Sequence, residues 1–185
     1  MTPGLRETAR RRVRAICLTT LAALSAASCE RFRPGGPRKS QPAVVVQQMG
    51  GTKLTVTYNR PVARGRTLFG GIVPFGQVWN PGADEATTLA VSRDVLLGGK
   101  PLSAGTYSVW AIPDSTTWTM ILSRASRVPH TPYPEGQDAL RVTVAPARAP
   151  HMEALGFYFP AADSALAVLA LHWGETIVAL PIARR

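Results

Sequence analysis

The sequence predicts one all-β domain over residues 43–185, an antiparallel β-sandwich or jelly-roll-like fold. Three observations indicate this. The chain has 185 residues, enough for a single domain with a hydrophobic core. Apolar residues make up 45% of it, which excludes disorder for most of its length. Its 16 Gly and 16 Pro are spread along the chain without a regular spacing. Turn-forming residues between short apolar segments favour strands and turns over long helices.

Residues 1–28 have the features of a signal peptide of the lipoprotein type. Arginines at 10–14 form a charged start, Ala15–Ala27 forms a short apolar stretch, and small residues lead to Cys29. We expect Cys29 to be the site of lipidation, because this ending is similar to a bacterial lipobox. Simple cleavage and an uncleaved anchor are the alternatives.

Residues 29–42 are expected to form a flexible tether, because they combine Pro, Gly and basic side chains without an apolar period. The expected location is the cell envelope after export, with a lipid anchor in the outer membrane or a place in the periplasm. The membrane, reached through the N-terminal lipid, is the expected partner, together with an unknown envelope ligand or protein. Removal of the signal removes Cys17 and leaves one cysteine, so no intrachain disulfide is expected.

The net charge of +10 is concentrated near the N-terminus. Residues 1–28 contribute +4 and residues 29–42 contribute +3. The rest of the chain has 12 Lys and Arg against 9 Asp and Glu. A nucleic-acid surface needs a dense basic stripe, so nucleic acid is excluded as an expected partner.

The strands follow from period-2 alternation and turn residues. Ala43–Met49 and Lys53–Tyr58 flank Gly50-Gly51 and predict a hairpin. Further strands are expected at 86–91, 94–97, 106–112, 117–122, 140–144, 155–159, 166–173 and 176–182. Gly174-Glu175 is expected to link the last two strands. An Ala- and Leu-rich helix over Ala161–Leu171 is the alternative for that region.

Three aromatic residues are expected in the core. Tyr107, Trp110 and Trp118 lie on two predicted paired strands, where large rings fit the inner face. Gly105 followed two positions later by Tyr107 is similar to a tyrosine corner, in which the phenol bonds to nearby backbone.

Two segments, Asn59–Glu85 and Ser123–Asp138, remain outside the predicted strands. Long loops often carry function. The first has arginines, a Trp and adjacent carboxylates, which suit carboxylate, phosphate, sugar or cation ligands. The candidate ligand-binding residues are Arg60, Arg64, Arg66, Trp79, Asn80, Asp84 and Glu85. Alternatively, the arginines pair with Asp84, Glu85 or backbone carbonyls and pin the loop.

Motifs for catalysis are not found in the sequence. Gly65 and Gly70 are spaced as in a phosphate loop, but Gly71 stands where that loop has Lys. The three histidines, His130, His151 and His172, have no partner at metal-ligand spacing, so no metal or cofactor is expected. No catalytic residue is assigned.

Three functions are open. A non-catalytic binding or scaffolding module of the envelope is favoured, with Asn59–Glu85 as its contact surface. A hydrolase using Asp84 or Glu85 as general base beside an arginine is the second. The third is a structural lipoprotein with an exposed apolar patch or an open sheet edge.

The chain also resembles the bacterial secreted domain-of-unknown-function family 2911 over about residues 43–182. The similarity is carried by Asn59-Arg60-Pro61, Leu68-Phe69-Gly70-Gly71, Val78-Trp79, Gly82–Thr87, Ala104–Tyr107, Ile112-Pro113 and Trp118-Thr119. The resemblance implies export and an all-β fold, and it implies no established activity, cofactor or catalytic residue. Where the family usually has Arg-Thr-Gly-Ala-Asn-Glu after the Trp, this chain has Asn80–Glu85.

Overall fold

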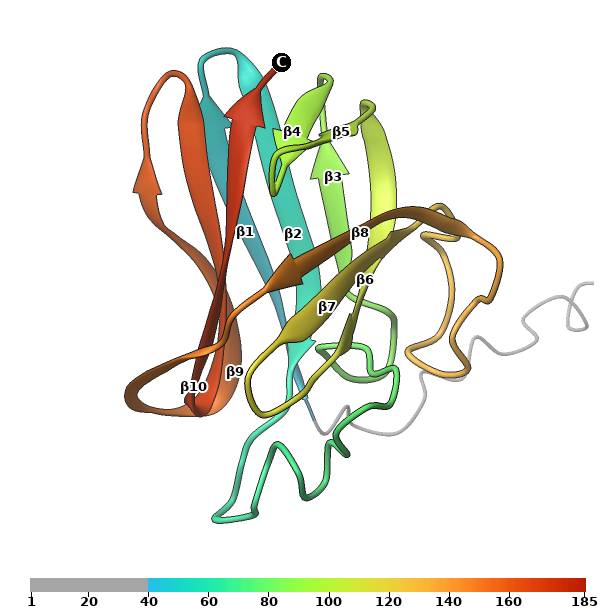
Figure 1. Ribbon diagram of the computed structural model, residues 1–185, viewed down its shortest axis with the longest axis vertical. Helices are drawn as coiled ribbons and strands as arrows, with labels where there is room; N and C mark the ends of the chain where they lie inside the picture. Colours follow the sequence, from blue (N-terminus) through green and yellow to red (C-terminus); the bar gives the residue numbers. More distant parts are fainter. Residues whose placement is uncertain (1–39) are drawn as a thin grey trace, which may run out of the picture. The chain divides into compact units, whose positions relative to one another are not determined.

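A computed structural model describes residues 40–185 (Figure 1). The predicted signal 1–28, Cys29 and the tether up to residue 39 lie outside the described residues. The described residues form two antiparallel β-sheets and contain no helix, which confirms the predicted all-β fold. The chain crosses between the sheets several times, so both layers depend on contacts between distant segments.

The larger sheet has six strands. In spatial order they are β1 (Gln41–Met49), β2 (Thr52–Arg60), β3 (Thr88–Val91), β6 (Gly105–Ile112), β7 (Trp118–Ser123) and β8 (Asp138–Val144). The smaller sheet has four strands. In spatial order they are β5 (Lys100–Leu102), β4 (Val95–Leu97), β10 (Leu166–Arg184) and β9 (Ala147–Ala162).

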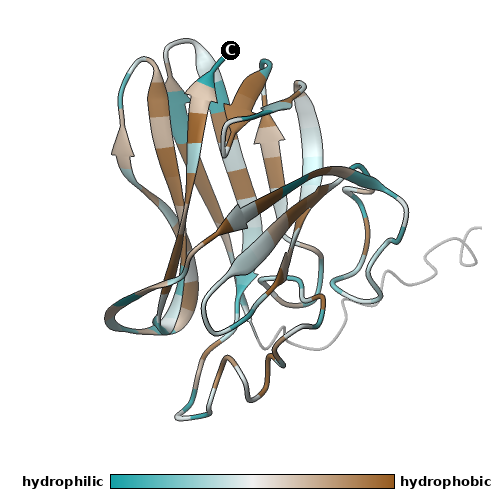
Figure 2. Ribbon diagram, in the orientation of Figure 1, coloured by the Kyte–Doolittle hydropathy of each residue, from teal (hydrophilic) through white to brown (hydrophobic). Residues whose placement is uncertain are grey.

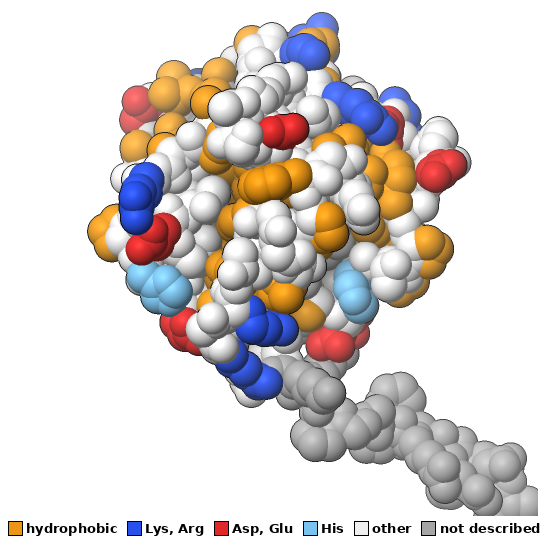
Figure 3. All heavy atoms as spheres, turned by 60° about the horizontal axis from the view of Figure 1, so that its bottom comes forward, with side chains coloured by type: hydrophobic (Ala, Val, Ile, Leu, Met, Phe, Trp, Pro, Cys, Tyr) orange, Lys and Arg blue, Asp and Glu red, His pale blue; other side chains and the backbone are white. Residues whose placement is uncertain are grey.

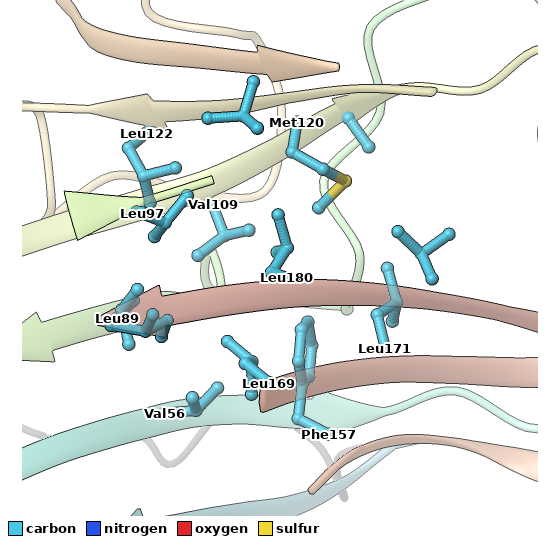
Figure 4. Packing of buried hydrophobic residues seen from close by; sticks show 14 of the residues in the cluster. Val56, Leu89, Leu97, Val109, Met120, Leu122, Phe157, Leu169, Leu171 and Leu180 are labelled. Atoms are coloured by element: carbon cyan, nitrogen blue, oxygen red, sulfur yellow. The ribbon is translucent and has the colours of Figure 1, made fainter. Parts of the chain in front are cut away.

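The core lies between the two sheets and follows from alternation along the strands. In β2, Leu54 and Val56 are fully buried, while Lys53, which comes directly before Leu54, is exposed on the opposite face. Figure 2 shows apolar residues recurring along strands of both sheets. Figure 4 shows Val56, Val109 and Met120 of the larger sheet facing Leu169 and Leu180 of the smaller one. The apolar area removed from water there is the main source of stability.

Two tyrosines fix backbone within this core. The Tyr107 hydroxyl donates to the carbonyl of Ser103 at 2.9 Å, which confirms the predicted tyrosine corner. The Tyr58 hydroxyl accepts from the amide of Phe157 at 3.1 Å and so joins β2 to β9. A single phenol thus satisfies a buried amide at the contact between the sheets.

Trp110 is buried as predicted, but on the other face of the larger sheet. Trp118 and Tyr107 belong to the core between the sheets, whereas Trp110 packs with Ala86 and Ile121 in a separate cluster. The expectation of one shared inner face was wrong for Trp110, because it stands an odd number of residues from Tyr107 in β6 and so faces the opposite way. Its cover comes from the segment that follows β7.

Strand limits differ from prediction in places. β1 begins at Gln41, two residues before Ala43, because Gln41 and Pro42 still pair with the end of β2. β5 was not predicted; its three residues pair with β4 through the turn at Gly98-Gly99. β2 runs from Thr52 to Arg60 and so extends beyond the predicted Lys53–Tyr58, while the turn at Gly50-Gly51 agrees with prediction.

The predicted turn at Gly174-Glu175 is wrong. β10 runs without a break through this position, and the turn between β9 and β10 lies at residues 163–165 instead. Gly174 has a φ of 59° and sits where the pairing with β9 shifts register, so the glycine forms a bulge. The alternative of a helix over Ala161–Leu171 is also wrong, because the segment contains the β9–β10 turn and strand on either side of it.

Gly174 is expected to be needed for packing as well as for its backbone angle. A Cβ there would lie 2.7 Å from Cδ1 of Leu68, whereas at Gly99, with a φ of 77°, a Cβ would meet nothing within 4 Å. Gly99→Ala should lower the free energy of unfolding by about 1–2 kcal/mol, because alanine is strained in the left-handed backbone region. Gly174→Ala should lower it by about 1–3 kcal/mol more, because the new Cβ also clashes with Leu68. Urea unfolding of the full chain measures both, and equal losses for the two variants would contradict this assignment.

Candidate functional site

The connection between β2 and β3, residues 61–87, forms the long loop at one end of the sandwich. The sequence predicted it over Asn59–Glu85; the structure places Asn59 and Arg60 in β2 and starts β3 only at Thr88, so the loop is confirmed with both ends shifted by two residues. We call it the β2–β3 loop. Its first part bonds to the smaller sheet: the amide of Ala63 donates to the carbonyl of Glu153, and the amide of Leu155 donates to the carbonyl of Pro61. These bonds attach the loop to the outer strand β9.

The middle of the β2–β3 loop bonds to the larger sheet. Trp79 and Ala111 exchange two backbone hydrogen bonds of 2.8 Å, and the amide of Gly76 donates to the carbonyl of Pro113 at 2.9 Å. Trp79 therefore extends the sheet beside β6 at a point that β3 does not reach. The loop is held by both sheets, and its irregular backbone is largely paired, as buried backbone must be.

Aromatic packing holds the same loop from inside. The ring centres of Phe69 and Trp118 lie 4.7 Å apart, and Trp79 stacks on Trp173 with ring centres 6.0 Å apart. Trp118 begins β7 and Trp173 belongs to β10, so the cluster includes a ring from each sheet. We call Phe69, Trp79, Trp118 and Trp173 the aromatic cluster. Trp79 is partly buried and packs from the loop against the core between the sheets.

Asn80 is a buried structural residue, with a relative exposure of 2%. Its side-chain amide donates to the carbonyl of Val109 at 2.8 Å, and its oxygen accepts from the amide of Thr87 at 3.2 Å. The Thr87 hydroxyl donates to the carbonyl of Pro81 at 2.7 Å. Together these bonds close the last part of the β2–β3 loop onto β6.

Two of the three arginines donate from their side chains to backbone carbonyls at the start of the loop. Arg60 donates from Nε to the carbonyl of Leu155 at 3.3 Å. Arg66 donates to the carbonyls of Ala63 and Val62 at 2.8 and 2.6 Å. Arg64 has a φ of 53°, and its main-chain amide, not its guanidinium, donates to Oε1 of Glu153 at 2.7 Å. For Arg60 and Arg66 this geometry favours the second of the sequence-based alternatives, in which the arginines bind backbone carbonyls and pin the loop.

Glu153 in β9 was not predicted, and no local pattern marks it. Oε2 of Glu153 lies 2.9 Å from Nε2 of His151, and its Oε1 accepts from the Arg64 amide. These two bonds, the one to His151 first, lower the pKa of the Glu153 carboxyl below its ordinary value. A charged acceptor is therefore held at the point where the loop leaves β2.

The carboxylates lie apart from the arginines. Asn59 and Arg60 are neighbours in β2, so their side chains point to opposite faces. Arg60 reaches β9, whereas Nδ2 of Asn59 donates to Oε2 of Glu85 at 2.9 Å and to the carbonyl of Ala83 at 2.8 Å. The structure therefore does not bring the candidate residues together in one site.

Asp84 and Glu85 lie at the end of the loop and are exposed. Asp84 has a φ of 64°, and its carbonyl accepts from the amide of His130 and from the ring Nδ1 of the same residue. Both residues line an open hollow of about 630 Å³ that also includes Arg127. The hydrolase hypothesis, with Asp84 or Glu85 as general base, stays a prediction.

A smaller hollow of about 320 Å³ lies at the same end of the sandwich as the β2–β3 loop, and we call it the loop-end hollow. Its walls come from the loop, the β6–β7 turn, the β8–β9 turn and β10. They are formed by Phe69, Phe75, Asp114, Ser115, Trp118, Pro146, Ala147, Arg148, Glu175 and Thr176. Sequence reasoning missed these residues except Trp118, because four distant segments supply them.

Apolar side chains are exposed at this end of the domain. Phe75 is 44% exposed, and Ile72 and Val78 of the same loop are 46% and 38% exposed. Figure 3, turned so that the bottom of Figure 1 comes forward, shows hydrophobic side chains gathered on this face with charged groups of both signs around them. Exposed apolar side chains on a loop whose inner side is bonded to both sheets are typical of a contact surface.

Within residues 40–185, no three His, Cys, Asp or Glu side chains are grouped so that they could hold a metal ion. The same residues include no helix with the length and hydropathy of a membrane span.

Removal of the Asn80 amide is expected to loosen the loop. Asn80→Ala leaves a buried carbonyl and a buried amide without their partner, which should cost about 2–4 kcal/mol of unfolding free energy. Gln77→Ala, an exposed change in the same loop, should stay within about 0.5 kcal/mol of the unchanged chain. Urea unfolding followed by fluorescence measures both. Equal midpoints for the two variants would show that Asn80 does not organise the loop.

Comparison with known proteins gives one result. No curated protein and no solved structure matches this chain. A family model described as DUF2911, a protein of unknown function, matches residues 40–182, which include every strand of the larger sheet and almost all of the smaller one. The chain therefore belongs to the DUF2911 family.

Proposed function

We propose that this protein is an exported cell-envelope lipoprotein, anchored through Cys29, that works as a non-catalytic binding module. The N-terminal sequence supports export and lipidation: a charged start, an apolar stretch and small residues precede Cys29. The contact surface is the end of the sandwich that carries the β2–β3 loop.

One observation carries the proposal of a contact surface. The β2–β3 loop exposes three large apolar side chains, Ile72, Phe75 and Val78, while bonds to both sheets and the aromatic cluster fix the loop behind them. Leaving apolar area in water is costly unless a partner covers it. A surface that is fixed in advance loses little conformational entropy on binding.

The position of the N-terminal end of the domain supports the same surface. Gln41 pairs with Arg60, the last residue of β2, so β1 starts at the end of the sandwich where the β2–β3 loop begins. Gln41 lies twelve positions after Cys29, with eleven residues between them. A chain of that length spans at most about 40 Å. The contact surface of an anchored protein therefore remains near the membrane, within reach of envelope components.

The test is co-sedimentation of the purified full chain with the detergent-insoluble envelope fraction of the producing cells. The variant Ile72→Ser/Phe75→Ser/Val78→Ser should bind at least about tenfold more weakly than the unchanged chain. A matched control is Val44→Ser/Val46→Ser, which removes two exposed apolar side chains from β1, 61% and 50% exposed.

The control should bind as the unchanged chain does, and circular dichroism confirms that both variants keep their strands. Unchanged sedimentation of the loop variant would contradict the proposed surface. Equal losses for the loop variant and the β1 variant would contradict it as well.

A further inference from the structure

The loop-end hollow combines an apolar wall with a polar rim. Phe69, Phe75 and Trp118 form the wall, and Trp118 is only 1% exposed, so Phe75 supplies most of the accessible ring surface. Asp114, Ser115, Arg148, Glu175 and Thr176 form the rim. Apolar lining with a few convergent polar groups is the usual composition of a small-molecule site.

We propose that the loop-end hollow binds one sugar ring of an uncharged glycan. The inference rests on the proposed binding function and assigns it a ligand class. A pyranose has a face of C–H groups and an edge of hydroxyls, so it matches a site with one aromatic side and one polar side. The negative face of an aromatic ring attracts such C–H groups.

The Phe75 ring is held in position for this contact. It packs against Gly70, where a Cβ would lie 2.8 Å from Cε2 of the ring. Gly70 has a φ of 78°, and its amide donates to the carbonyl of Val73 at 2.9 Å. The backbone bond from Gly76 to Pro113 fixes the residue after Phe75. The ring is therefore placed by backbone on both sides of it before any ligand arrives.

The rim offers donors and acceptors side by side. Arg148 donates from Nη2 to Oε2 of Glu175 at 2.6 Å, and both side chains are more than half exposed. A guanidinium carries five N–H donors, and a carboxylate accepts several hydrogen bonds. At the edge of the hollow, the Asp114 carboxylate accepts from the amide and the hydroxyl of its neighbour Ser115. Neighbouring sugar hydroxyls, each a donor and an acceptor, satisfy such a mixed rim.

The charge of the rim selects against anionic ligands. Asp114 and Glu175 are two carboxylates against the single guanidinium of Arg148, so the lining carries a formal charge of −1. A phosphate or carboxylate ligand would meet repulsion there and would need more cations than the hollow provides. An uncharged glycan avoids that cost, which is why we assign it in preference to a phospholipid head group.

Isothermal titration calorimetry on the full chain, held in a polyoxyethylene detergent that contains no sugar, tests the assignment. The probes are uncharged oligosaccharides of β-1,4-linked N-acetylglucosamine, β-1,4-linked glucose, α-1,4-linked glucose and β-1,4-linked xylose. At least one should bind with a dissociation constant of about 10 μM to 1 mM. Glycerol phosphate, the soluble head group of phosphatidylglycerol, is the anionic comparison.

Phe75→Ala should weaken saccharide binding by about tenfold or more, because the ring face is lost. Val44→Ala removes an exposed apolar side chain of β1 that belongs neither to the hollow nor to the proposed contact surface, and should change binding by less than about twofold. Both positions are exposed, so neither variant is expected to disturb folding.

Three results would overturn the inference: no saccharide binds, the two variants weaken binding equally, or glycerol phosphate binds and the saccharides do not. If envelope co-sedimentation still depends on Ile72, Phe75 and Val78 in any of these cases, the ligand class fails and the proposed function stands. If co-sedimentation is independent of the loop, the proposed function itself fails.

Discussion

Four aromatic rings meet where the β2–β3 loop enters the end of the sandwich, and the position of every other part of that loop depends on this contact. Phe69 and Trp79 come from the loop, Trp118 from the larger sheet and Trp173 from the smaller one. Each favourable ring pair is worth about 0.5–1.5 kcal/mol beyond the area it buries. The cluster therefore closes the core and fixes the loop with the same side chains.

The loop uses its polar groups on the inner side, which determines what it can offer to a partner. Asn80 and Arg66 bond to backbone carbonyls, and Glu153 of β9 accepts from the loop's own amide at Arg64. Two of the residues that sequence patterns mark as ligand-binding, Asn80 and Arg66, thus hold the loop in place. The exposed apolar side chains and the rim of the loop-end hollow are the groups that we assign to recognition.

The fold could be predicted from the sequence because its signals are local. Alternation in Lys53–Tyr58 and glycine turns define strands without knowledge of their partners. Gly174 shows the limit: a glycine with positive φ serves a turn or a bulge equally well, and only the pairing of β10 with β9 decides between them. Trp110 shows another limit. Its burial could be predicted, but the sequence pattern does not show that the segment after β7 covers the outer face of the larger sheet, where Trp110 is buried.

The candidate site could be predicted only as a place on the chain. The β2–β3 loop was identified, but Asn59 and Arg60 diverge to opposite faces of β2 and separate the carboxylates from the arginines. Phe75, Asp114, Arg148 and Glu175 come together from the β2–β3 loop, the β6–β7 turn, β9 and β10, and no spacing in the sequence connects them. Their proximity is a product of tertiary packing, which single-sequence patterns do not contain.

The central claim is that this long loop is a fixed part of the sandwich rather than a mobile connection. Amide hydrogen exchange of the full chain, followed by NMR, tests it directly at Gly76 and Trp79, whose amides donate to Pro113 and Ala111. The account predicts exchange at least about a thousandfold slower than in an unstructured peptide, comparable to the amides of β6. Exchange of both amides at the unstructured rate would contradict it.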